Sequence, residues 1–251
     1  MKKYLTCAII FLSLELVSCA EDDEPEWKAS EVCPEAGTNR YGMPNRGTFT
    51  DERDGRVYKY TTIGDQVWMA ENLKYDAPYS LCPNGEKYAE QYCFLAEQGC
   101  NTPECCMQNL CELFGRYYSI IENGENQGLI DRALADTICP KGWHIPTKEE
   151  IELLFDNMRG DDNEWRAADR MKISDTNMFV AYEILSPGTD DCGLSFIMAG
   201  YYRMKDVFQM GGANILSTTQ VKVDCVWGGV VDNRIGSFVS DYRSPIRCLK
   251  D

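Results

Sequence analysis

Cysteine is the residue that most restricts how this chain can fold. The sequence holds 13 cysteines in 251 residues. Such a set forms a disulfide framework in an exported protein and more often a metal or redox site in a cytosolic one. No C-x-x-C pair occurs, the nearest ligand-like spacing leaves four residues between cysteines, and the chain has a single histidine. We therefore expect no metal site of the Cys/His type. Whether the cysteines form disulfides then depends on the cellular compartment.

The N-terminus indicates export. Residues 1–18 place two lysines before an apolar segment, which is typical of a secretory signal and is too short for a membrane span of about 20 apolar residues. The segment ends in Leu-Val-Ser-Cys, which resembles the bacterial lipobox, so we expect cleavage before Cys19 and lipidation of that cysteine, with plain secretion as the alternative. We predict an outer membrane lipoprotein that contacts the membrane through this lipid anchor.

An acidic run, Glu21 to Glu26, follows the expected lipidation site. Like charges repel and nothing apolar is available for burial, so residues 19–46 are predicted to form a solvated tether. The run is also similar to the export signal of lipoproteins that reach the cell surface, which favours a surface location. The two interpretations are compatible with the same residues.

Net charge excludes one class of partner. The formal charge is −15, and removal of the signal makes it more negative by one unit. Without a basic stripe or a nucleic-acid motif, we expect no nucleic-acid partner. About 200 ordered residues suffice for one core, so we predict one domain over residues 47–251, with no cofactor and no metal.

Eleven cysteines remain once Cys7 and Cys19 are assigned to the signal and the anchor. Because eleven is odd, at least one thiol is free or pairs with another chain, and Cys33 is the candidate for such a disulfide-linked dimer. Six of the others lie within residues 82–111, a segment with few apolar residues. We interpret residues 76–113 as a cysteine-rich insertion that its own bridges hold together.

Periodicity predicts an α+β fold with antiparallel strands, two short helices and disulfide stabilisation. The hairpin signals Asp54-Gly55 and Gly64-Asp65 join expected strands at 47–50, 56–63 and 66–69 into a meander. Thr147 and Glu150 form a capping box for a helix that Gly160 ends, and a second helix is expected over 164–173. Further strands are expected at 194–202, 225–231, 235–240 and 245–249.

Several motifs together resemble the Fibrobacter succinogenes major paralogous domain over about residues 47–251. They are DGRVY (54–58), IGDQVWMAENL (63–73), GRYY (115–118), CPKGWHIPT (139–147), AGYY (199–202) and RCLKD (247–251). The WHIP segment is also similar to a segment of the formylglycine-generating enzyme family, so the resemblance implies a C-type-lectin-like fold. In that fold the chain's end pairs near the first helix, which implies a Cys139–Cys248 bridge, with Cys192–Cys225 as a second one.

No catalytic constellation is evident, so we do not expect an enzyme. His144 lacks a recognisable nucleophile elbow and is interpreted as scaffold. The favoured hypothesis is a non-catalytic binding or adhesion module for a glycan, a fibre or a surface protein. An envelope protein that partners another chain and an enzyme on the same fold are the alternatives. Candidate ligand contacts are aromatics beside Gly- and Asp-rich loops: Tyr201, Tyr202, Trp227 and Tyr242.

Overall fold

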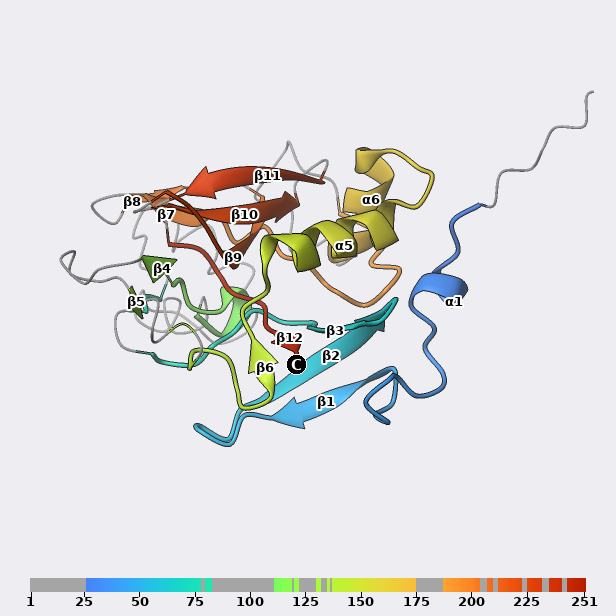
Figure 1. Ribbon diagram of the computed structural model, residues 1–251, viewed down its shortest axis with the longest axis horizontal. Helices are drawn as coiled ribbons and strands as arrows, with labels where there is room; N and C mark the ends of the chain where they lie inside the picture. The colour runs from blue at the N-terminus through green and yellow to red at the C-terminus, as the bar shows by residue number, and fades with distance from the viewer. Residues whose placement is uncertain are drawn as a thin grey trace, which may run out of the picture.

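The computed structural model describes most of the chain after the acidic run. The described residues are 26–77, 80–82, 111–118, 120–121, 130–131, 135, 137–174, 187–203, 207–209, 212–222, 225–231, 235–240 and 243–251. The fold is α+β, as predicted: helix α5 lies between a five-stranded sheet and a three-stranded sheet (Figure 1). The predicted signal and the lipidated Cys19 lie outside the described residues.

The five-stranded sheet begins with the predicted meander. Strands β1 (Arg46–Thr50), β2 (Val57–Ile63) and β3 (Gln66–Met69) pair antiparallel, and the hairpin between β2 and β3 turns at Gly64 and Asp65. The last strand, β12 (Leu249–Lys250), then lies between β3 and β6 (Trp143–His144), which gives the order β1-β2-β3-β12-β6. The end of the chain is therefore inside the sheet.

Helices α5 and α6 begin where the sequence predicts. Helix α5 (Lys148–Arg159) has the complete capping box, in which Thr147 Oγ1 accepts from the N–H of Glu150 and the Glu150 carboxylate accepts from the N–H of Thr147. Asn163 caps α6 (Glu164–Met171) by accepting from two backbone N–H groups. A short additional helix, α1 (Ala29–Val32), precedes the first sheet.

The three-stranded sheet has the order β11-β10-β9. It consists of β9 (Ala213–Lys222), β10 (Cys225–Val231) and β11 (Ile235–Ser240), all antiparallel. Two small pairs accompany it: β4 (Ile120–Ile121) with β5 (Ile130–Asp131), and β7 (Tyr201–Arg203) with β8 (Val207–Gln209). A Cβ atom on Gly229 would lie 2.7 Å from Ile151 and 2.8 Å from Phe155, so α5 packs directly on β10.

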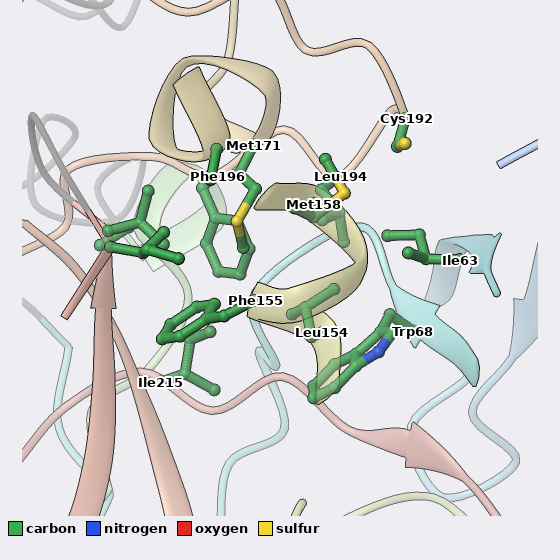
Figure 2. Close-up of a cluster of buried hydrophobic side chains, with 14 of the residues drawn as sticks. Ile63, Trp68, Leu154, Phe155, Met158, Met171, Cys192, Leu194, Phe196 and Ile215 are labelled. Atoms are coloured by element: carbon green, nitrogen blue, oxygen red, sulfur yellow. The ribbon is translucent and has the colours of Figure 1, made fainter. Parts of the chain in front are cut away.

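The main core lies between α5, α6 and the two sheets. Leu154 packs near Trp68 of the five-stranded sheet, and Phe155 packs near Ile215 of β9 (Figure 2). A second cluster includes Tyr58, Tyr118 and Trp143 and is completed by Cys139 and Cys248. The five-stranded sheet thus contributes apolar side chains to two cores.

Two predicted strands are mostly wrong. Residues 194–202 form a strand only from Tyr201, because Ser195 adopts a φ of 50° and the backbone carbonyls of Leu194 and Ser195 accept hydrogen bonds from the Arg247 side chain. The expected strand at 245–249 shrinks to β12. Among the described residues, backbone pairing before Tyr201 in the first segment is limited to one parallel bridge between Lys172 and Phe196, so burial alternates there without a regular strand.

The expected tether over residues 19–46 is wrong from residue 27 onward. Trp27 Nε1 donates to the backbone oxygen of Asn157 at 2.8 Å, and its ring lies 3.9 Å from the guanidinium of Arg170. Cys33 is buried and bonded to Cys192. Apolar packing and a covalent bond therefore attach this segment to the domain. In the described part of the chain, no helix is long and apolar enough to cross a bilayer.

Candidate functional site

Two of the family-like motifs, IGDQVWMAENL and RCLKD, meet at one buried cation, Arg247. Its side chain is fully buried and donates to Asn72 Oδ1 at 2.8 Å and to the backbone oxygens of Leu194 and Ser195. The guanidinium also lies 4.0 Å from the centre of the Phe196 ring. Burial lowers the pKa of Arg247 to about 9, which leaves it charged at neutral pH. Arg247 therefore joins the C-terminal strand to the 187–200 loop.

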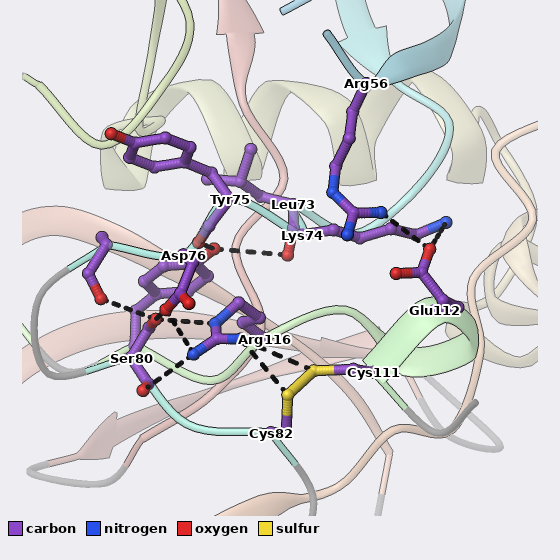
Figure 3. The surroundings of a disulfide bond; sticks show 12 residues. Arg56, Leu73, Lys74, Tyr75, Asp76, Ser80, Cys82, Cys111, Glu112 and Arg116 are labelled. Carbon is purple, nitrogen blue, oxygen red and sulfur yellow. Dashed lines mark hydrogen bonds and ion pairs between the residues drawn. A yellow bond between two sulfur atoms is a disulfide. The ribbon is translucent and has the colours of Figure 1, made fainter. Parts of the chain in front are cut away.

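Arg116 of the GRYY motif lies beside the Cys82–Cys111 disulfide (Figure 3). Arg116 donates to Ser80 Oγ at 2.8 Å, pairs with Asp76 at 2.5 Å and lies 3.3 Å from Cys82 Sγ. Gly115 has a φ of 75°, and a Cβ there would lie 2.8 Å from the Leu73 carbonyl oxygen. Only glycine fits this backbone comfortably. The motif thus anchors the base of the cysteine-rich insertion.

The single histidine sits between two carboxylates. His144 Nδ1 is 2.7 Å from Asp251 Oδ1, and Nε2 is 3.1 Å from both carboxylate oxygens of Glu150. The hydrogen bond to Glu150 is the largest cause of the raised pKa of His144; burial acts in the opposite direction, and the hydrogen bond to Asp251 raises the pKa further. Because the carboxylates lie at opposite edges of the ring, the three groups cannot converge on one metal ion. No cluster of potential metal ligands is present among the described residues.

The predicted scaffold role of the CPKGWHIPT segment agrees with its contacts. Trp143 is buried and stacks on Phe49 with ring centres 4.3 Å apart. Pro146 accepts from the N–H of Thr218, and Thr219 Oγ1 accepts from the N–H of Lys148 at 2.8 Å. The segment therefore joins the five-stranded sheet, α5 and β9.

The predicted ligand contacts fall in or beside the β-strands that follow residue 200, which we call the β7–β11 region (residues 201–240). Tyr201 is half-buried and stands opposite Gln209 in the β7–β8 pair. Tyr202 lies in β7, and Trp227 stands opposite Val239 in β10 and β11; the structure describes their backbone positions. Tyr242 lies outside the described residues.

Hydrogen bonds connect the start of β7 to the start of β9. The N–H of Gly200 donates to the Gly212 carbonyl, and Asn214 Nδ2 donates to the Gly200 carbonyl, both at 3.3 Å. Val231, at the far end of β10, stands opposite Ala213. Tyr201 is thereby placed near one end of the three-stranded sheet, while Trp227 lies four residues along β10 from that end.

Three disulfides are described. Cys139 and Cys248 are bonded, which confirms the pairing that the family resemblance implied. The predicted Cys192–Cys225 bridge is wrong, because Cys192 is bonded to Cys33, and Cys33 is consequently not the odd thiol. The carbonyl of Cys192 accepts from Thr61 Oγ1 at 2.6 Å, so this bridge ties the N-terminal segment to β2 as well.

Sequence reasoning missed two features of this site. The buried Arg247 appeared in a motif, but its partners are far away in the chain. In the His144 cluster, which consists of His144, Glu150 and Asp251, the two carboxylates lie 6 and 107 positions after the histidine in the sequence. The capping box did contain Glu150, so a histidine six residues before a capping glutamate was the one available signal for half of that cluster.

These contacts define an α+β domain in which the Cys33–Cys192 disulfide and the buried Arg247 attach the segment around Cys33 and the segment before β12 to the same loop, residues 187–200. The model of the Fibrobacter succinogenes major domain matches residues 61–250. The chain belongs to this family. No match was found among curated proteins or among solved structures.

Proposed function

We propose that this protein is a surface-exposed bacterial lipoprotein whose domain acts as a non-catalytic binding or adhesion module for a glycan, a fibre or a protein. One observation carries the proposal: the residues that the family motifs contribute are engaged inside the domain. Arg247, Asn72, Gly115, Arg116 and Trp143 all make internal contacts that hold the fold. A rigid scaffold of this kind leaves recognition to the loops and strands that it carries.

The hydrogen bonds of His144 favour a binding function over a catalytic one. Both ring nitrogens already face carboxylates, so neither is directed at a substrate. A general base needs a nitrogen within hydrogen-bond reach of the proton that it removes. The sole histidine is therefore better suited to a structural role, which supports the non-catalytic proposal.

We further propose that the domain is C-type-lectin-like. The position of β12 inside the five-stranded sheet, beside the strand that precedes α5, supports this assignment. The Cys139–Cys248 bridge, which links the chain's end to the segment before α5, also supports it. Fold alone does not specify the ligand, so the binding surface must be found by experiment.

The β7–β11 region is the proposed ligand surface. The test is binding of the oxidised chain from Ala20 to Asp251 to insoluble polysaccharides, soluble glycans and matrix proteins, with and without calcium. We expect saturable binding to one class, and at least tenfold weaker binding after Tyr201→Ala or Trp227→Ala. Trp165→Ala is the matched control, because Trp165 is 58% exposed but lies on α6, outside this region.

Two results would contradict the binding proposal. Equal loss of affinity in the Trp165 control would place the contact elsewhere on the domain. Binding to no member of the panel would remove the glycan and matrix ligands and leave a partner protein of the envelope as the remaining candidate. Reducing agent that converts a dimer to a monomer would favour that second function.

Lipid anchoring is tested separately. A Cys19→Ala variant should leave the membrane fraction, whereas the wild-type chain should partition into detergent and carry the mass of its acyl chains. Protease added to intact cells should remove the wild-type domain if it faces outward. A water-soluble wild-type chain would contradict the anchor and leave the binding proposal intact.

A further inference from the structure

The His144 cluster joins parts of the fold that are distant in sequence. His144 lies in β6, Glu150 in the first turn of α5 and Asp251 directly after β12. The backbone of His144 pairs with Leu249, and the N–H of Asp251 donates to the Gly142 carbonyl at 3.2 Å. The imidazole therefore connects the chain's end to the helix that separates the two sheets.

Hydrogen-bond chemistry makes this connection depend on protonation. An imidazolium has two N–H donors and can satisfy both carboxylates at once, whereas neutral imidazole has only one donor. After deprotonation, one ring nitrogen presents a lone pair to a carboxylate oxygen, which is repulsive. Either the Asp251 contact or the Glu150 contact must then open or recruit water.

The other charged groups near the ring do not replace these contacts. On α5, Lys148 is paired with Glu152 at 3.5 Å. On β12, Lys250 pairs with Trp143, and both side chains lie on the face of the sheet away from His144. Lys250 donates to the Gly142 carbonyl and lies over the rings of Tyr41 and Trp143. From β3, the neutral Gln66 side chain donates to the Glu150 backbone. Among the described residues, Glu150 and Asp251 are thus the charges that face His144.

Glu150 is the less able of the two carboxylates to move. Its oxygen also accepts from the N–H of Thr147 at 2.7 Å as part of the capping box, and the group is about one-third exposed. Asp251 is 56% exposed. We therefore expect the Asp251 contact to open first when the ring loses its proton.

We propose that His144, Glu150 and Asp251 form a pH-sensitive latch that holds the end of the chain against β6 and the first turn of α5. The protonated ring closes the latch, and loss of the proton releases Asp251 while the capping box persists. The raised pKa of His144 places this opening above the ordinary value of 6.5. The latch is closed below pH 6.5 while both carboxylates are ionised, and it opens as pH rises through the raised pKa of His144.

The single histidine makes the test direct. The oxidised chain gives one imidazole signal in a carbon–proton NMR spectrum, and its titration midpoint should lie above 6.5. Glu150→Gln and Asp251→Asn should each lower that midpoint. Glu152→Gln is the matched control, since it makes the same change on an exposed residue of the same helix and should leave the midpoint within 0.2 units of wild type, a tolerance of roughly 0.3 kcal/mol.

Hydrogen exchange supplies the second readout. The protection factor of the Asp251 amide, corrected for intrinsic exchange, should fall at least threefold as pH crosses the midpoint in the wild type. In His144→Gln the protection factor should not change with pH. A midpoint at or below 6.5, equal midpoints in all variants, or a constant protection factor in the wild type would each overturn the latch; the wild-type titration decides even if a variant fails to fold.

Discussion

Loss of the Cys33–Cys192 bridge should destabilise the domain more than loss of any short bridge. The two cysteines are 159 residues apart in sequence. The chain-entropy model assigns about 5 kcal/mol to a loop of that length. The Cys139–Cys248 bridge is interleaved with it and offers a path of similar length, so it does not shorten the loop that Cys33–Cys192 closes.

The variant for this test is Cys33→Ala with Cys192→Ala. Both side chains are buried in the main core, and alanine avoids placing an unpaired hydroxyl there. The matched control is Cys82→Ala with Cys111→Ala, whose loop spans 29 residues. The logarithmic dependence on loop length makes the long bridge worth about 1.5 kcal/mol more than the short one.

The assay is equilibrium unfolding in guanidinium without reductant, followed by tryptophan fluorescence. Trp68 is fully buried and should report the loss of the main core. We expect the free energy of unfolding to fall by 2–5 kcal/mol and the m-value to rise, because the unfolded chain becomes more extended. A control variant that loses as much stability as the long-bridge variant, at unchanged m-value, would refute the chain-entropy reasoning.

Four further outcomes can be checked on the same protein. Arg247→Met should lower the free energy of unfolding in urea by about 3–5 kcal/mol, because the oxygens of Asn72, Leu194 and Ser195 lose a buried charged donor. A decrease below about 1 kcal/mol would show that these oxygens find other donors. Gly115→Ala should lower the melting temperature by several degrees, since the alanine Cβ meets the Leu73 carbonyl at a positive φ, and an unchanged melting temperature would contradict that clash. Alkylation of the unreduced protein should label a cysteine among 93, 100, 105, 106 and 225 and should spare Cys33, whereas a labelled Cys33 would disprove its bridge. Burial acts to raise the pKa of Glu150, but the hydrogen bonds of Glu150 with His144 and Thr147 lower that pKa below the ordinary 4.5. The stabilisation that Glu150 contributes is therefore complete above pH 4.5 and is lost as pH falls through the lowered pKa. Glu150→Gln should flatten this acid limb of the stability curve, and an unchanged limb would argue against the pairing of Glu150 with His144.

Local signals predicted the elements whose stability is local. The start of α5 follows from Thr147 and Glu150, and the β2–β3 hairpin follows from Gly64 and Asp65, because each signal sits within a few residues of its effect. The Cys139–Cys248 pairing came instead from the family resemblance, which carries information on distant contacts that no single segment holds.

Distant partners explain what the sequence could not predict. Residues 194–202 alternate like a strand, but the Arg247 side chain, some fifty residues later, donates to the backbone carbonyls of Leu194 and Ser195. Asp190 also accepts from the N–H and hydroxyl of Ser195, which fixes the turn, and burial raises the pKa of Asp190 despite these bonds. Cysteine spacing likewise gives no pairing, so Cys33 was assigned to the wrong role.

The Cys33–Cys192 bridge also determines how the domain would carry tension. Under the proposed lipid anchor, tension on the N-terminal segment would reach the fold through Trp27 and Cys33. From Cys33 the load crosses the disulfide to Cys192 and needs only nine more residues to reach Tyr201. If a ligand is held there, residues 34–191 lie outside the covalent load path, and shear on the membrane tether would not unzip β1 from β2. The bridge would then keep residues 34–191 from carrying the tension between the N-terminal segment and the bound ligand.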